Sequence, residues 1–135
     1  MRDLGTKAVR DVDLGKVDYE GCFSPLVLHA FASFMQEHNR TVDGTARTCS
    51  DWKSGWSEEA YMKSMWRHFF DLWALYSGMF VYKERTPNGE FTHILPGRPG
   101  IDVTEGWTEE TIETAGLALM FNLQGFMHEH LKGGS

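Results

Sequence analysis

The chain has 135 residues, of which 41% are hydrophobic, and its formal net charge is −6. This length suits a single domain, and the negative charge argues against binding to a nucleic acid polymer, because phosphate backbones are bound by clustered Lys and Arg. No stretch approaches the ~20 apolar residues of a membrane span, and the first residues lack the apolar region of a secretion signal. We therefore expect a cytoplasmic protein that does not bind membranes.

The N-terminal part is predicted to be an arm followed by a helix. Residues 1–23 show no sustained hydrophobic period, which is typical of an extended arm laid on the domain. Ser24 and Pro25 then favour a helix start, because Ser caps free amides and Pro suits the first helical position. We expect this helix to cover about residues 25–39. Cys22 and Cys49 lack CxxC spacing, which predicts two reduced thiols.

A polar segment, TVDGTARTCSDWKSGW, follows this helix and predicts a long irregular loop. Loops of this length are often functional. Arg47 and Lys53 of this loop could close over a triphosphate, together with Arg10 and Lys16 of the arm. Trp52 could stack on a purine or could instead anchor the loop to the core.

The second predicted helix begins at Ser57, which is followed by two Glu residues that favour a helix N-terminus, and ends near Tyr76 before Ser77 and Gly78. One face is apolar and is expected to form the core: Met62, Met65, Trp66, Phe69, Leu72, Trp73 and Tyr76. The spacing i, i+3, i+4 and i+7 puts four polar residues on another face: Ser64, Arg67, His68 and Asp71. These four could hold a phosphate, a metal ion or a proton, or could form a solvated surface with an ion pair.

Two β-favouring runs flank the turn at Pro87, Asn88 and Gly89, which predicts a two-stranded hairpin over residues 79–96. A lone hairpin is marginally stable, so it should pack on the helices or on another subunit. A last helix is predicted from Thr108 to about Leu131. Its expected core stripe is Ile112, Leu119, Met120, Leu123, Phe126 and Met127.

Small and polar residues form a separate row on this last helix: Ala118, Asn122, Gly125 and Glu129. Such a row permits a close helix approach or leaves space for a ligand. Asn122 could contact a base or could complete a buried hydrogen-bond network. Glu110 and Glu113 are either acidic residues favoured at a helix start or ligands of a metal ion.

Four segments together resemble a known family: Gly5 to Tyr19 (GTKAVRDVDLGKVDY), Asp51 to Gly55 (DWKSG), Met62 to Asp71 (MKSMWRHFFD) and Phe121 to Glu129 (FNLQGFMHE). In order and spacing, the chain resembles the phage-encoded dATP/dGTP diphosphohydrolases, a MazG-like group of small helical nucleotide pyrophosphohydrolases. The resemblance implies hydrolysis of a deoxypurine triphosphate to a monophosphate and pyrophosphate.

The resemblance assigns roles to the polar residues already named. It implies a Mg²⁺ ion held by carboxylates of Asp71, Glu110 and Glu113, with His68 and Asp71 around the metal or the attacking water. The nucleotide would be bound by Arg10, Lys16, Arg47, Trp52, Lys53, Ser64, Arg67 and Asn122.

The chain departs from this family because it has one Glu-x-x-Glu, at Glu110 and Glu113, and no Glu-x-x-Asp. This departure favours an alternative, a non-catalytic phage protein that binds and sequesters a nucleotide or a nucleotide-derived immune signal as a countermeasure to host defence. A third hypothesis is a structural module whose hairpin pairs with a partner.

The expected architecture is a mainly α single domain over residues 1–135, with a three-helix core, an N-terminal arm and an inserted β-hairpin, in a MazG-like helical assembly. Three helices would leave the Phe and Trp side chains only partly covered. We therefore expect a homodimer or a higher homo-oligomer.

Overall fold

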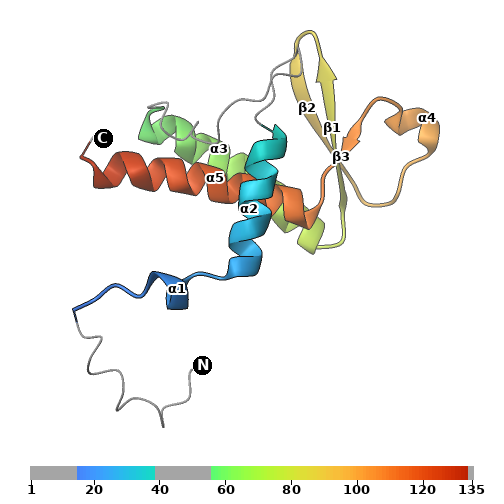
Figure 1. The fold of residues 1–135 in the computed structure, drawn as a ribbon. Helices are drawn as coiled ribbons and strands as arrows, with labels where there is room; N and C mark the ends of the chain where they lie inside the picture. The colour runs from blue at the N-terminus through green and yellow to red at the C-terminus, as the bar shows by residue number, and fades with distance from the viewer. Residues whose placement is uncertain (1–14, 39–55, 134–135) are drawn as a thin grey trace.

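Two long antiparallel helices form the centre of the structure, a computed structural model that describes residues 15–38 and 56–133. Helix α3 (Glu58–Tyr76) lies along α5 (Ile112–Leu131), and α2 (Pro25–His38) packs across α5 (Figure 1). The short helix α1 (Tyr19–Cys22) lies away from this pair. Within the described ranges, none of the helices has the length and apolar character needed to cross a membrane.

Side-chain caps begin the helices where the sequence predicts them. Ser24 Oγ accepts a hydrogen bond from the Val27 amide at 3.2 Å, and Ser57 Oγ accepts one from the Ala60 amide at 3.1 Å. Both bonds satisfy amides that have no partner inside the helix. The predicted starts of α2 and α3 are thus confirmed. In the arm, Asp18 caps α1, so residues 19–22 form a helical turn where an extended chain was expected.

The sheet overturns the expected fold class. Strands β1 (Phe80–Thr86) and β2 (Gly89–Leu95) form the predicted hairpin, with Thr86 opposite Gly89. A third strand, β3 (Thr108–Glu109), pairs with the other edge of β1, which gives the order β2-β1-β3. The mainly α, MazG-like architecture is therefore wrong: the chain combines its helices with a three-stranded antiparallel sheet.

The third strand can form because α5 begins later in the chain than the sequence predicts. Thr108 was expected to begin the helix, but Thr111 does so: Thr111 Oγ accepts from the Thr114 amide at 3.1 Å, and Thr114 Oγ accepts from the Thr111 amide at 2.9 Å. Thr108 and Glu109 thereby remain extended and pair with the backbone groups on the edge of β1. A short helix, α4 (Ile101–Thr104), connects the hairpin to β3.

Small and polar residues, and not the expected apolar stripes, make up most of the buried positions on α3 and α5. These positions are Tyr61, Asp71 and Ala74 on α3 and Ala115, Asn122, Gly125 and Glu129 on α5. Several residues of the expected core are exposed instead: Met62, Trp66, Phe69, Trp73 and Tyr76 on α3, and Ile112, Leu123 and Met127 on α5. The physical reason is close approach, because a helix face without bulky side chains lets the two backbones come together.

Gly125 shows how close this approach is. A Cβ atom at this position would lie 2.3 Å from the ring of Tyr61, a side chain that is 0% exposed. At Gly125, the row of small residues on α5 therefore serves helix packing. From the sequence alone, this row could have served either a close helix approach or space for a ligand.

We predict that Gly125→Ala destabilises the protein by about 1–3 kcal/mol, because the buried Tyr61 ring must move to make room for the methyl group. The matched control is Gly116→Ala in the same helix, where an added Cβ meets no atom of the structure within 4 Å. This control should gain up to ~1 kcal/mol from helix propensity. Urea unfolding of both variants measures the difference, and equal stability would contradict the packing described here.

Candidate functional site

A polar cleft lies where the helix pair meets the sheet, with a volume of about 330 Å³. This volume lies at the lower end of the range found for small-molecule sites. Its described lining comes from α2, α3, α5, the sheet and the segment before β3: Phe34, His68, Lys83, Arg85, Glu90, Gly106, Thr108, Glu109, Glu110, Thr114 and Ala118. Charges of both signs thus face one small volume.

Lys83 of this lining forms a buried ion pair with Asp71, which is not itself among the described lining residues, and this pair joins α3 to β1. Asp71 is 2% exposed, and the Nζ of Lys83 donates to its Oδ2 at 2.7 Å. The same Nζ donates to Oγ1 of Thr92 on β2 at 2.8 Å. A carboxylate removed from water requires such partners, because desolvation of an unpaired charge costs several kcal/mol. Lys83 therefore neutralises Asp71 and ties helix α3 to both strands of the hairpin.

Two further side chains complete a cluster around Asp71. His68 lies one helical turn before it on α3, and Glu110 comes from the residue after β3. One ligand atom each of His68, Asp71 and Glu110 lie within 4.8 Å of one another. Acidic groups often gather without binding an ion, but the mixed set of a buried carboxylate, an imidazole and a second carboxylate is suited to a divalent cation.

Glu110 is held in this cluster at both its backbone and its side chain. Its amide donates to the carbonyl of Val81 at 2.8 Å, which extends the pairing of β3 with β1 by one residue. Its Oε1 accepts from Oγ1 of Thr114 at 2.8 Å. The short strand that sequence analysis mistook for helix is thus the element that brings Glu110 to His68 and Asp71.

Burial lowers the pKa of His68 from its ordinary value of 6.5, and this desolvation is the largest effect on the imidazole. The carboxylates of Asp71 and Glu110 act in the opposite direction, whereas the positive charges of Lys83 and Arg67 add to the lowering. The Nδ1 atom of His68 is also buried and has no hydrogen-bond partner in the described part of the chain. A neutral imidazole with an unpartnered nitrogen can accept a proton or bind a cation.

The two carboxylates of this set are oxygen ligands of the kind that Mg²⁺ prefers, whereas the imidazole is more typical of transition metals; Mg²⁺ is commonly held by one or two carboxylates together with substrate phosphates. Asp71 and Glu110 would supply these carboxylates. Because Lys83 donates to Oδ2 of Asp71, a cation would share this carboxylate with the ammonium group. Lys83 and Arg85, on the same strand at i and i+2, are the cations of the cleft that could face phosphate oxygens.

The structure brings together three of the residues singled out from the sequence: His68, Asp71 and Glu110. Glu113 is exposed and lines a different, apolar hollow between α2 and α5. Four further candidates are not among the described residues that line the cleft: Lys16, Ser64, Arg67 and Asn122. Arg10, Arg47, Trp52 and Lys53 lie outside the residues that the structure describes.

Asn122 has a structural environment of its own on α5. It is 3% exposed, its Nδ2 donates to the carbonyl of Ala118 at 2.9 Å, and its Oδ1 is buried with no hydrogen-bond partner among the described residues. The amide is therefore half satisfied within the α3–α5 contact.

Sequence analysis missed the two cations of β1. Lys83 and Arg85 alternate with Tyr82 and Glu84, and the period of two that predicts the strand also places both cations on one face. The sequence predicts that the hairpin packs on the helices or on another subunit, but it does not show which of its faces meets α3. Thr114 was also missed, although its spacing of three from Thr111 is that of a capping box.

Comparison of the chain with protein-family models, curated proteins and solved structures finds no match. Evidence for a function therefore comes from the cleft and from the four sequence segments described above.

We predict that the His68 imidazole titrates below pH 6.5 in the folded, chelator-treated protein, because burial disfavours its charged form. Unfolding in urea should return the midpoint to its ordinary value. Since the unfolded chain binds this proton more readily, stability should fall as the pH drops below about 6.5. Histidine NMR signals measure both midpoints, and a folded midpoint at or above the unfolded one would contradict the described burial.

We also predict that Lys83→Met destabilises the protein by about 3–5 kcal/mol, because it leaves the Asp71 carboxylate buried without its counter-ion. The matched control is Arg85→Met, two residues along the same strand, which removes an ion pair to Glu90 whose arginine side chain is 83% exposed. This control should cost at most ~1 kcal/mol. Denaturant unfolding compares the two, and similar losses would show that the Asp71 pair is not buried as described.

Proposed function

We propose that this protein is a divalent-cation-dependent nucleotide pyrophosphohydrolase that converts dATP or dGTP to the monophosphate and pyrophosphate. The observation that carries the proposal is the cluster of His68, Asp71 and Glu110 beside the cations Lys83 and Arg85. Hydrolysis of a nucleotide requires both parts, because the phosphates need cationic partners and the attacking water needs a base. The choice of deoxypurine substrates rests on the family resemblance of the four sequence segments.

Each side chain has a role that its surroundings allow. Asp71 and Glu110 would hold Mg²⁺, and Lys83 and Arg85 would orient the phosphate oxygens. A bound Mg²⁺ would polarise those oxygens and offset the negative charge that develops on them. The neutral imidazole of His68 accepts the proton of water as the water oxygen bonds to the α-phosphorus. The bond from the α-phosphorus to the oxygen shared with the β-phosphorus breaks, and pyrophosphate leaves. We place this activity in the cytoplasm, where nucleotides are available.

A second candidate function is supported by the ion pair between Lys83 and Asp71. Because Lys83 already neutralises this carboxylate, the folded cleft does not require a metal ion for charge balance. A protein that binds and sequesters a nucleotide or a nucleotide-derived signal would use the same cleft without hydrolysis. Affinity would then be independent of Mg²⁺, whereas hydrolysis would depend on it.

The decisive comparison uses the two acidic residues spaced three apart, Glu110 and Glu113. Glu110→Gln should lower Mg²⁺-dependent pyrophosphate release from dATP or dGTP by about 100-fold, because it removes a charged ligand while Thr114 can still donate to the amide oxygen. Glu113→Gln should leave the rate unchanged, since Glu113 lies outside the cluster.

The assay measures pyrophosphate release with and without Mg²⁺, and chromatography of the heat-denatured protein measures any retained nucleotide. Equal rates for the two variants would contradict the proposed metal site. Intact nucleotide held tightly with EDTA present, and no turnover with Mg²⁺, would support sequestration instead.

A further inference from the structure

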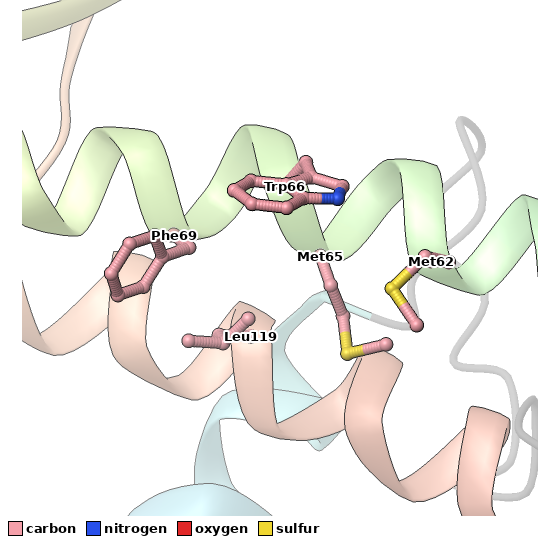
Figure 2. Close-up of a pocket in the computed structure, with 5 residues that line it drawn as sticks. All are labelled: Met62, Met65, Trp66, Phe69 and Leu119. Carbon is pink, nitrogen blue, oxygen red and sulfur yellow. The ribbon is translucent and has the colours of Figure 1, made fainter.

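The proposed activity leaves unused an exposed apolar face on the α3–α5 pair. We define this face by Met62, Met65, Trp66, Phe69 and Trp73 of α3 together with Leu119 of α5. Five of these side chains line one hollow of about 280 Å³, and Figure 2 shows them gathered over the two helices. A second hollow contains Phe69 and Trp73 and continues the face toward the end of α3.

The side chains of this face are too exposed to form the core of an isolated chain. Trp66 is 67% exposed, Trp73 is 57% exposed and Phe69 is 47% exposed. By contrast, the buried hydrophobic residues in the described part are Met35, Tyr61, Ala74, Val81, Tyr82 and Ala115, of which two are alanines. Monomeric proteins rarely leave a contiguous apolar patch of several hundred Å² in water. The face therefore requires a covering surface.

The pattern of charge also marks this face as the centre of an interface. Met62, Trp66, Phe69 and Trp73 follow each other at spacings of four and three, so they form one stripe without a charged residue. Glu59 and Lys63 form an exposed ion pair on a neighbouring row, with their charged atoms 3.6 Å apart. An apolar centre bordered by charged residues is the usual anatomy of a protein interface.

The area is sufficient for a stable dimer. On α5 the exposed Leu123 and Met127 follow Leu119 at spacings of four and extend the face along that helix. Helices of 19 and 20 residues are about 30 Å long, and two of them side by side present a face about 20 Å wide. Covering this face on two chains would bury roughly 1,200 Å² in total, which reaches the range of specific interfaces.

We infer that a second copy of this chain covers the apolar face, so that the α3–α5 pairs of two protomers pack together about a two-fold axis. The remaining parts of this chain are a poor match in composition. Residues 1–14 contain no aromatic residue and six charged ones, and residues 39–55 contain only two large apolar side chains, Val42 and Trp52. An identical face supplies what they lack, because a two-fold axis places like residues opposite one another and four helices then share one core.

This interface leaves the cleft open. Phe69 and Trp73 lie two residues on either side of Asp71, so they project about 160° away from it around the α3 axis. Each protomer would keep its own complete cluster of His68, Asp71 and Glu110. Dimerisation through the apolar face therefore does not rest on the proposed function. An experiment that disproves one of the two proposals would not disprove the other.

The test compares two phenylalanines of nearly equal exposure, Phe69 at 47% on the apolar face and Phe91 at 49% on β2. Sedimentation velocity of the full chain at about 100 μM should give twice the 15.4 kDa chain mass. Phe69→Lys should weaken the dimer by at least about 30-fold, because a charge would enter the interface centre, and Phe91→Lys should leave the dimer unchanged. A monomeric wild-type chain, or equal dimerisation of both variants, would overturn the inference.

A cross-linking measurement keeps the test decisive if Phe69→Lys fails to fold. In a chain with Cys22→Ser and Cys49→Ser, Phe69→Cys should form a covalent dimer with a short bis-maleimide, since Phe69 lines both hollows and so lies near the middle of the proposed interface. Phe91→Cys is the matched control and should remain uncross-linked at the same concentration. Equal cross-linking of the two would show that the apolar face is not where the copies meet.

Discussion

The buried pair of Asp71 and Lys83 is the interaction on which the rest of the structure depends. It joins the last turns of α3 to β1, and through Thr92 it reaches β2. β1 in turn holds β3, and β3 holds Glu110 above Asp71. One ion pair thus links α3 to the sheet, and its lysine lines the cleft. The Asp71 carboxylate thus stabilises the fold and is also a ligand in the proposed cation site.

Lys83 and a bound cation would therefore compete for the Asp71 carboxylate. Lys83 satisfies the carboxylate in the folded chain, and a cation bound there must do so alongside the ammonium group or displace it. Competition of this kind makes metal affinity sensitive to the position of Lys83, and hence to anything that moves β1. A nucleoside triphosphate could lower the free-energy cost of cation binding by drawing the Lys83 ammonium group toward its phosphates. Binding of substrate and of cation would then support each other.

Local signals in the sequence were sufficient for the helix starts and the hairpin. Ser24, Ser57 and the turn at Pro87–Asn88 act through bonds to residues close by, so their effect can be deduced without the tertiary fold. The strand at Thr108–Glu109 could not be found in this way, because two residues pair only when the free edge of β1 is already in place. The same limit explains why Lys83 was missed as the partner of Asp71.

The helix faces show a second limit of prediction from the sequence. An apolar stripe identifies a surface that must be covered, but it does not say whether the same chain covers it. Between α3 and α5 the contact within the chain brings Tyr61 against Gly125, while Trp66 and Phe69 are exposed. The stripe carrying His68 and Asp71 was recognised from its spacing, but only the structure shows that it faces the sheet and meets Glu110.

The most direct test of the cation site at Asp71 is to titrate the isotopically labelled protein with Mn²⁺ and to follow paramagnetic broadening in its NMR spectrum. Broadening should begin at His68, Glu110 and Thr114, which surround the cluster, and should spare the acidic residues Glu58 and Glu129 at the far end of the helix pair until much higher concentrations. Addition of Mg²⁺ should reverse it. Broadening that begins elsewhere, or that spreads evenly over the acidic surface, would contradict a cation site at Asp71.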